Sequence, residues 1–197
     1  MQLMIVTGSH AEQSQSARVA HFLKRRAIEL NLCAADDVLV QDLGSDPLPF
    51  WNSAQRGSPT PHEAFLTAST ALILISPDWH GMATPAIKNW FYHLPAQALE
   101  HKPVLLCGVS AGDGGAYPVM DMRAYSFKNF RPCYLPEQLI VRKVREEFLD
   151  EAGAPAERSL TLERADYCLR LLSAYAKGFE GIRKQLPERA AAFAYGV

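Results

Sequence analysis

The amino-acid sequence predicts a three-layer α/β sandwich, in which helices cover both faces of a five-stranded parallel sheet and a helical extension follows. Short apolar runs alternate along the chain with longer segments of helical periodicity. Two runs, 71–76 and 104–109, are apolar almost throughout, which is typical of strands buried on both faces of a parallel sheet. Because helix-length segments separate the runs, the strands are expected to pair in parallel through right-handed crossovers.

Each expected element has a local reason. Residues 3–7 form an apolar run that stops at Gly8, and residues 14–30 place their apolar side chains near one helical face. Pro77 ends the third run, and Pro85 fits the first turn of the following helix. The expected strands are 3–7, 38–42, 71–76, 103–110 and 138–141. The expected helices are 14–30, 61–69, 84–94, 116–129 and 159–185, the last with candidate core positions Leu160, Leu162, Ala165, Cys168, Leu169 and Leu172.

Length and charge limit the class of protein. A chain of 197 residues is long enough for one sizeable domain, so residues 1–145 are assigned to the core and 146–197 to a helical extension of the same domain. With 20 Lys+Arg and 21 Asp+Glu, the net charge of −1 gives no electrostatic reason to expect nucleic acid. No apolar run is long enough to span a membrane, and the first residues lack the basic start of a signal peptide. We therefore expect a cytoplasmic protein.

Cysteine and histidine spacing supports neither a disulfide framework nor a metal site. The 4 cysteines form no CxxC pair, and the 6 histidines form no HxxxH or HxH pair. Reduced, buried or half-buried thiols and no bound metal are the expectation.

The loop after the first strand, residues 8–16, has the features of an anion site. The hydroxyls of Ser9, Ser14 and Ser16 adjoin a helix start, where unpaired N–H groups and the helix dipole favour an anion. Neither GxGxxG nor GxxxxGK(S/T) is present, which argues against a Rossmann loop and against a P-loop. Plain N-capping would explain Ser14 or Ser16 equally well. Glu12 also opposes phosphate, since no Lys or Arg in the loop offsets it.

The loops after the third and fourth strands belong on the same rim, because the carboxyl ends of parallel strands meet there. In the first of them, Trp79 offers a planar ligand an aromatic wall, Asp78 and His80 offer polar edges, and Gly81 offers open backbone. The second, residues 110–115, is rich in glycine, so its amides can approach a ligand closely. Packing for Trp79, a surface position for His80 and turn formation for Asp78 are the ordinary alternatives.

Four segments resemble the motifs of a known protein family, and they follow one another along the chain in the order that the family has. They are Gly8-Ser9 with Ser14 and Ser16, Asp42-Leu43 ahead of Pro47-Leu48-Pro49, Ser76-Pro77-Asp78-Trp79-His80-Gly81 with Lys88-Asn89, and the glycines of 112–115. Over about residues 1–142 the chain resembles the NADPH-dependent FMN reductase family, which includes quinone and azo-dye reductases. The resemblance implies a flavodoxin-like fold and FMN as cofactor. It further implies ping-pong transfer of hydride from NADPH or NADH through FMN to a quinone, a free flavin or an azo compound.

The resemblance also implies roles for individual residues. Ser9, Ser14 and Ser16 would surround the FMN phosphate, with His10 partly replacing a missing arginine. The isoalloxazine ring would be lined by Pro77, Asp78, Trp79, His80 and Gly81, and its far end by Ser110, Gly112 and Gly114. Lys88 and Asn89 would support the ring loop. No side-chain acid or base is obligatory, because the cofactor carries the chemistry, and His80 and Tyr117 are the candidates for protonating a product.

Some positions depart from the family pattern and keep alternatives open. His10 and Ala11 stand where the family commonly has arginine, Asp78-Trp79-His80 replaces Glu-Tyr-Asn, and Phe91 replaces an acid. A binding or regulatory protein with weakened flavin affinity is therefore one alternative. A flavodoxin-like electron carrier is another, although such carriers are typically acidic. The family also implies a homodimer or tetramer, with the apolar pair Phe50-Trp51 suited to the interface.

Overall fold

The computed structural model describes residues 1–56, 58–95, 97–125, 127–148 and 159–186, and a parallel sheet forms its centre. The strands are β1 (Leu3–Thr7), β2 (Val38–Asp42), β3 (Ala71–Pro77), β4 (Pro103–Val109) and β5 (Cys133–Val141). Every neighbouring pair is parallel, and the order is β2-β1-β3-β4-β5. This order is that of flavodoxin-like folds, so the predicted fold class is confirmed.

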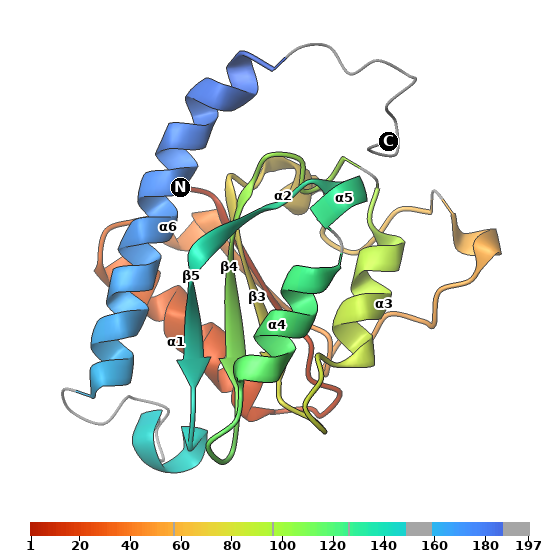
Figure 1. Ribbon diagram of the computed structural model, residues 1–197. Helices are drawn as coiled ribbons and strands as arrows, with labels where there is room; N and C mark the ends of the chain where they lie inside the picture. The colour runs from red at the N-terminus through yellow and green to blue at the C-terminus, as the bar shows by residue number, and fades with distance from the viewer. Residues whose placement is uncertain (57, 96, 126, 149–158, 187–197) are drawn as a thin grey trace.

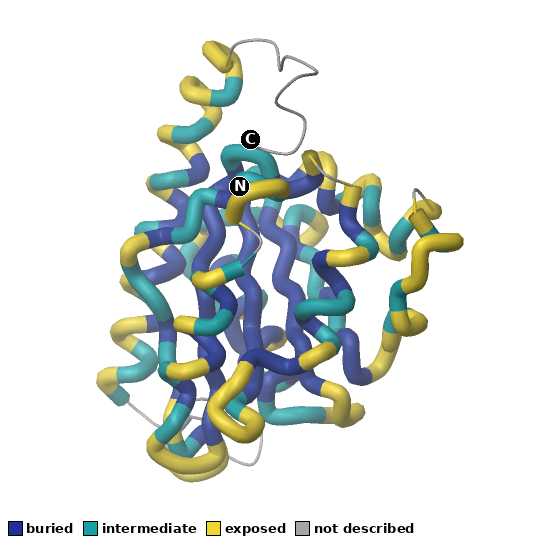
Figure 2. The backbone as a smooth tube through the Cα atoms, turned by 45° about the vertical axis from the view of Figure 1, so that its right-hand side comes forward, coloured by how far each residue is buried: buried dark blue, intermediate teal, exposed yellow. Residues whose placement is uncertain are grey.

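Helices cover both faces of the sheet (Figure 1). Helices α1 and α6 pack on one face, and α3 and α4 pack on the other, so two apolar cores flank the sheet. The strands are buried through the middle of the molecule, while the loops at the ends of the strands are mostly exposed (Figure 2). The helices are α1 (Gln15–Glu29), α2 (Glu63–Ala68), α3 (Pro85–His93), α4 (Ala116–Ala124), α5 (Phe127–Phe130) and α6 (Leu160–Lys184).

Two expected elements differ from the structure. The expected helix over 116–129 is two short helices, because Tyr125 adopts an extended conformation (φ −126°, ψ 171°) after the last residue of α4. The last strand begins at Cys133 and not at 138, although it contains Pro136. Proline is tolerated there because β5 lies at the edge of the sheet.

Helix α6 is integrated into the core. Leu169 and Leu172 are fully buried, whereas Leu160, expected in the core, is 82% exposed in the first turn of the helix. Arg26 of α1 binds Asp166 of α6 through two hydrogen bonds, of 2.9 Å from Nε to Oδ1 and 2.6 Å from Nη2 to Oδ2. Of the expected extension, residues 149–158 and 187–197 lie outside the described part of the chain.

The thiols behave as expected. Cys107 and Cys168 are buried, and Cys33 and Cys133 are half-buried; all four are free. Burial raises the pKa of the Cys168 thiol to about 11, so it stays protonated and unreactive at neutral pH. In the described ranges, no three His, Cys, Asp or Glu side chains gather as a metal site requires. The described helices also include none with the length and apolar character of a membrane span.

Lys102 gives the fold a pH dependence. Its side chain is buried at the start of β4, and Nζ donates to the carbonyls of Leu66 (2.6 Å) and Thr67 (3.0 Å) near the end of α2. Desolvation by burial, together with repulsion from Arg183, lowers the pKa of Lys102 from 10.5 to about 8. Below pH 8 the folded state bears the cost of a buried charge. Between about pH 8 and 10.5 only the unfolded chain stays protonated, so this group makes stability rise with pH.

We expect Lys102→Met to remove that rise. At one pKa unit per 1.36 kcal/mol, the contribution is at most about 3 kcal/mol. The measurement is urea unfolding of both proteins at pH 7.5 and pH 10. We subtract the free energy of unfolding of the variant from that of the unmodified protein. This difference should be larger at pH 10 than at pH 7.5. A difference that does not change with pH would contradict the assigned titration.

Candidate functional site

Three loops are tied to one rim of the sheet at the carboxyl ends of β1, β3 and β4 (the lower end in Figure 1). The first backbone amide of each loop continues the ladder to the neighbouring strand, which fixes where the loop leaves the sheet. These hydrogen bonds run from Gly8 N to Ile75 O (2.9 Å), from Asp78 N to Val109 O (2.8 Å) and from Ser110 N to Val141 O (2.8 Å). The sequence correctly predicts that the three loops share one rim.

The first loop ends in an open helix start. Ser14 is the N-cap of α1, and its Oγ accepts a hydrogen bond of 3.0 Å from Ala17 N. The amides of Gln15 and Ser16 have no acceptor within the described residues, so they remain free to bind an anion. The ordinary N-capping role of Ser14 is thus real, but it does not exclude anion binding, because the hydroxyl can still donate its own hydrogen.

The start of the first loop is packed tightly. Ser9 is buried, and its Oγ accepts a hydrogen bond of 3.2 Å from Ala11 N. Thr84 Oγ1 donates to the carbonyl of Gly8. A Cβ at Gly8 would lie 2.8 Å from Thr84 Oγ1. A Cβ at Gly44 would lie only 2.4 Å from the Ala11 carbonyl. Gly44 and Thr84 were not predicted, because their importance lies in close approach to a loop distant in sequence.

The second loop forms an exposed tight turn. His80 and Gly81 both have positive φ (57° and 72°), and Met82 N donates to Trp79 O at 3.2 Å. The indole of Trp79 is 49% exposed, and its ring centroid lies 5.7 Å from that of His10 in the first loop. A Cβ at Gly81 would meet nothing within 4 Å. The turn therefore presents an aromatic face beside open backbone, and it lies against the first loop.

Asp78 ties the second loop to the third. Its Oδ1 accepts from Gly81 N at 3.0 Å, and its Oδ2 accepts from Gly115 N at 2.6 Å. A Cβ at Gly114 would lie 2.6 Å from the same Oδ2, so a larger residue there would displace the Asp78 carboxylate. Within that loop, the hydroxyl of Ser110 accepts from Gly112 N at 3.1 Å. Both oxygens of Asp78 are thus engaged by backbone, which confirms the turn-forming alternative for its carboxylate.

Lys88 and Asn89 support two different loops. Lys88 Nζ lies 3.2 Å from Asp121 Oδ2, which also accepts from Ala83 N at 2.9 Å, so Lys88 supports the loop after β3 as expected. Asn89 was expected to do the same and does not. Its Nδ2 donates to the Pro49 carbonyl at 3.0 Å, and its Oδ1 accepts from Trp51 N at 2.9 Å. Asn89 therefore braces the proline-rich loop after β2.

The rim fits FMN, the cofactor that the resemblance implies. At one end, free amides and serine hydroxyls suit a phosphate; further along, Trp79 and the open backbone at Gly81 and Gly112 suit a planar ring. The candidate proton donors both reach solvent, since His80 is at the tip of the turn and Tyr117, in the first turn of α4, is 69% exposed. Pro77 is the last residue of β3, directly before the turn.

Comparison with known proteins points the same way. The sequence model of the NADPH-dependent FMN reductase family matches residues 1–146. An NADPH azoreductase from Bacillus sp. (strain OY1-2) is 24% identical over 151 residues, which cover 74% of this chain and 80% of that protein.

Solved structures of low sequence identity share the fold. FerB, a flavoenzyme NAD(P)H:(acceptor) oxidoreductase from Paracoccus denitrificans, has a TM-score of 0.67 at 17% identity, covering 91% of this chain and 97% of its own. An oxidoreductase from Corynebacterium diphtheriae has a TM-score of 0.67 at 15% identity, with coverage of 90% and 98%. The apo form of the NADH:FMN oxidoreductase EMOB has a TM-score of 0.56 at 14% identity, with coverage of 96% and 91%.

Proposed function

This chain belongs to the NADPH-dependent FMN reductase family, and we propose that it reduces a quinone, a free flavin or an azo compound by a ping-pong mechanism. It is a flavin-dependent oxidoreductase with FMN as cofactor and NAD(P)H as reductant. The observation that best supports the proposal is the rim itself. Three loops, held by the strand ladder and by Asp78, place anion donors and an open aromatic turn on one side of the molecule.

The residues of the first loop bind the phosphate in this proposal. The free amides of Gln15 and Ser16 point along the axis of α1, where the helix dipole favours negative charge. The hydroxyls of Ser9, Ser14 and Ser16 add donors. His10 supplies positive charge when it is protonated, in place of an arginine. Glu12 is exposed, so its carboxylate can stay in water.

The other two loops orient the ring. The chemistry that FMN supplies when bound is acceptance of hydride from NAD(P)H and its delivery to a second substrate. Residues 77–81 would line the ring, and backbone amides near Trp79 and His80 would donate to its polar edge. Ser110, Gly112 and Gly114 would lie at the far end. Because the turn is exposed, it would leave one face of the ring open to the reductant and to the acceptor. His80 or Tyr117 holds the proton for the product.

The assembly in this proposal is a homodimer or a tetramer in the cytoplasm. Large apolar side chains are exposed on the loop after β2 and on α4, among them Phe50 (87%) and Met120 (59%). Trp51 is half-buried against Tyr92, with ring centroids 5.4 Å apart, so Phe50 is the member of the Phe50-Trp51 pair that is available to a partner. Exposed apolar residues of this kind suit a subunit contact.

The experiment that tests the function starts from an absorbance spectrum of the purified protein with and without added FMN. We expect flavin absorbance and quenched flavin fluorescence, steady NADPH oxidation with a quinone, and parallel double-reciprocal lines when both substrates are varied. Flavin binding without turnover would favour an electron carrier. A colourless protein that ignores FMN would favour a binding or regulatory role and would overturn the proposal. Intersecting lines would reject the ping-pong mechanism alone.

A further inference from the structure

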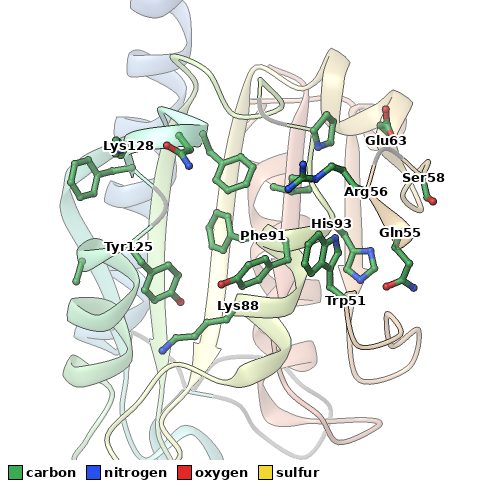
Figure 3. A pocket seen from close by; sticks show the side chains of 17 residues that line it. Trp51, Gln55, Arg56, Ser58, Glu63, Lys88, Phe91, His93, Tyr125 and Lys128 are labelled. Carbon is green, nitrogen blue, oxygen red and sulfur yellow. The ribbon is translucent and has the colours of Figure 1, made fainter. Parts of the chain in front are cut away.

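We propose that a cavity away from the rim binds a planar aromatic anion such as an aromatic sulfonate or carboxylate. The cavity has a volume of about 990 Å³ and lies between α3, the end of α4, α5 and the segment after β2 (Figure 3). Its size is within the range of small-molecule sites. Six aromatic residues contribute to its lining: Trp51, Phe91, Tyr92, Tyr125, Phe127 and Phe130.

The cavity is separate from the flavin site. Helices α3 and α4 both begin at the rim and run away from it, and nine residues of helix span about 13 Å. The cavity is lined by the last part of these helices, including Tyr92 and Ala124, and by α5 beyond them. Among the lining residues that belong to α3, Lys88 is the one closest to the start of the helix. None of the rim residues assigned to FMN contributes to the lining.

The aromatic walls are held in place by contacts among themselves. Phe91 packs against Tyr125 and Phe130, each with a centroid distance of 5.7 Å, and Trp51 lies 5.4 Å from Tyr92. Asn89 fixes Trp51 by accepting its backbone N–H at 2.9 Å. A wall that is already ordered loses little entropy when a flat ligand binds, and its rings offer faces and edges for stacking.

The charge of the lining selects an anion. Arg56, Lys88 and Lys128 face the cavity, against one acid, Glu63, whose Oε2 accepts from Thr60 N at 3.0 Å. Lys88 is paired with Asp121 and lies 5.1 Å from the ring centroid of Tyr125. Arg56 and Lys128 have no ion-pair partner among the residues that the structure describes. Two uncompensated cations beside aromatic walls recognise a ring that carries a negative charge.

The test compares two ligands of the same shape by isothermal titration calorimetry. Naphthalene-2-sulfonate carries the charge, and naphthalene-2-sulfonamide does not. The protein is saturated with FMN, so that the rim is filled. We expect one sulfonate per chain, bound more tightly than the sulfonamide. In Arg56→Gln/Lys128→Gln the sulfonate dissociation constant should rise about tenfold or more, and that of the sulfonamide less than about twofold.

Two control proteins make the result specific. Arg170→Gln/Lys177→Gln removes the same charge from exposed positions of α6 and should leave both affinities unchanged. Phe127→Ala, at a side chain that is 58% exposed, should weaken both ligands without harming the fold. Equal loss in the two charge variants, or equal affinity of the two ligands, would overturn the proposal. So would a dimer that binds neither ligand and dissociates in Phe127→Ala, because the cavity would then be a subunit contact.

Discussion

Replacing Ser9 and Ser14 together by alanine is expected to weaken FMN binding by about 1–3 kcal/mol, roughly 5- to 150-fold in the dissociation constant. The physical reason is that hydrogen bonds to a doubly charged phosphate are strong, and the first loop contains no Lys or Arg to take over. The measurement is quenching of flavin fluorescence during titration of the protein into FMN.

A loss of folding could imitate this result, because Ser14 also caps α1. Loss of a serine N-cap costs about 1 kcal/mol of stability. Ser159 provides a matched control, since it caps α6 in the same way, accepting from Leu162 N at 3.1 Å far from the rim. Ser159→Ala should lower stability similarly and leave the FMN dissociation constant unchanged. An unchanged constant in the Ser9/Ser14 variant would reject this placement of the phosphate.

The parts of the fold that the sequence predicts are those set by local pattern. Residues 71–76 are apolar except for Ser76, and the strand they form is buried on both faces. Helix α1 begins after Ser14, as a serine ahead of an amphipathic segment indicates. The interruption after Ala124 was missed, because residues 119–129 contain neither Gly nor Pro and the cause is an extended Tyr125. Pro136 concealed the first half of β5, which only its edge position makes permissible.

The candidate site shows the same division. Its three loops could be placed on one rim from topology alone, since parallel strands end together. The contacts that hold these loops in place could not be predicted, because they involve residues that are distant in sequence. Asp121 receives the amide of Ala83 and pairs with Lys88, and Thr84 binds the Gly8 carbonyl. Nothing in the sequence around Asp121 distinguishes it from a solvated helix residue. The same reason explains why Asn89 was assigned to the wrong loop.

Replacing Leu169 by alanine is expected to lower the free energy of unfolding by about 2–5 kcal/mol. Leu169 is fully buried in the core cluster that also contains Leu105 of β4 and Leu139 of β5, so truncation leaves a cavity between α6 and the sheet. The family match ends at residue 146, yet the helix beyond it closes one face of the sheet, and the buried position of Leu169 makes the effect large.

Leu160 offers the same substitution on the same helix without burial. It is 82% exposed in the first turn of α6, so Leu160→Ala should change stability by less than about 0.5 kcal/mol. The measurement is urea unfolding followed by circular dichroism, with a shift of midpoint at an unchanged slope. If both variants unfold at the midpoint of the native chain, residues 1–145 do not need α6 for their core. If only Leu169→Ala shifts, α6 belongs to the domain, because its apolar face supplies the layer without which β4 and β5 would be exposed on that side.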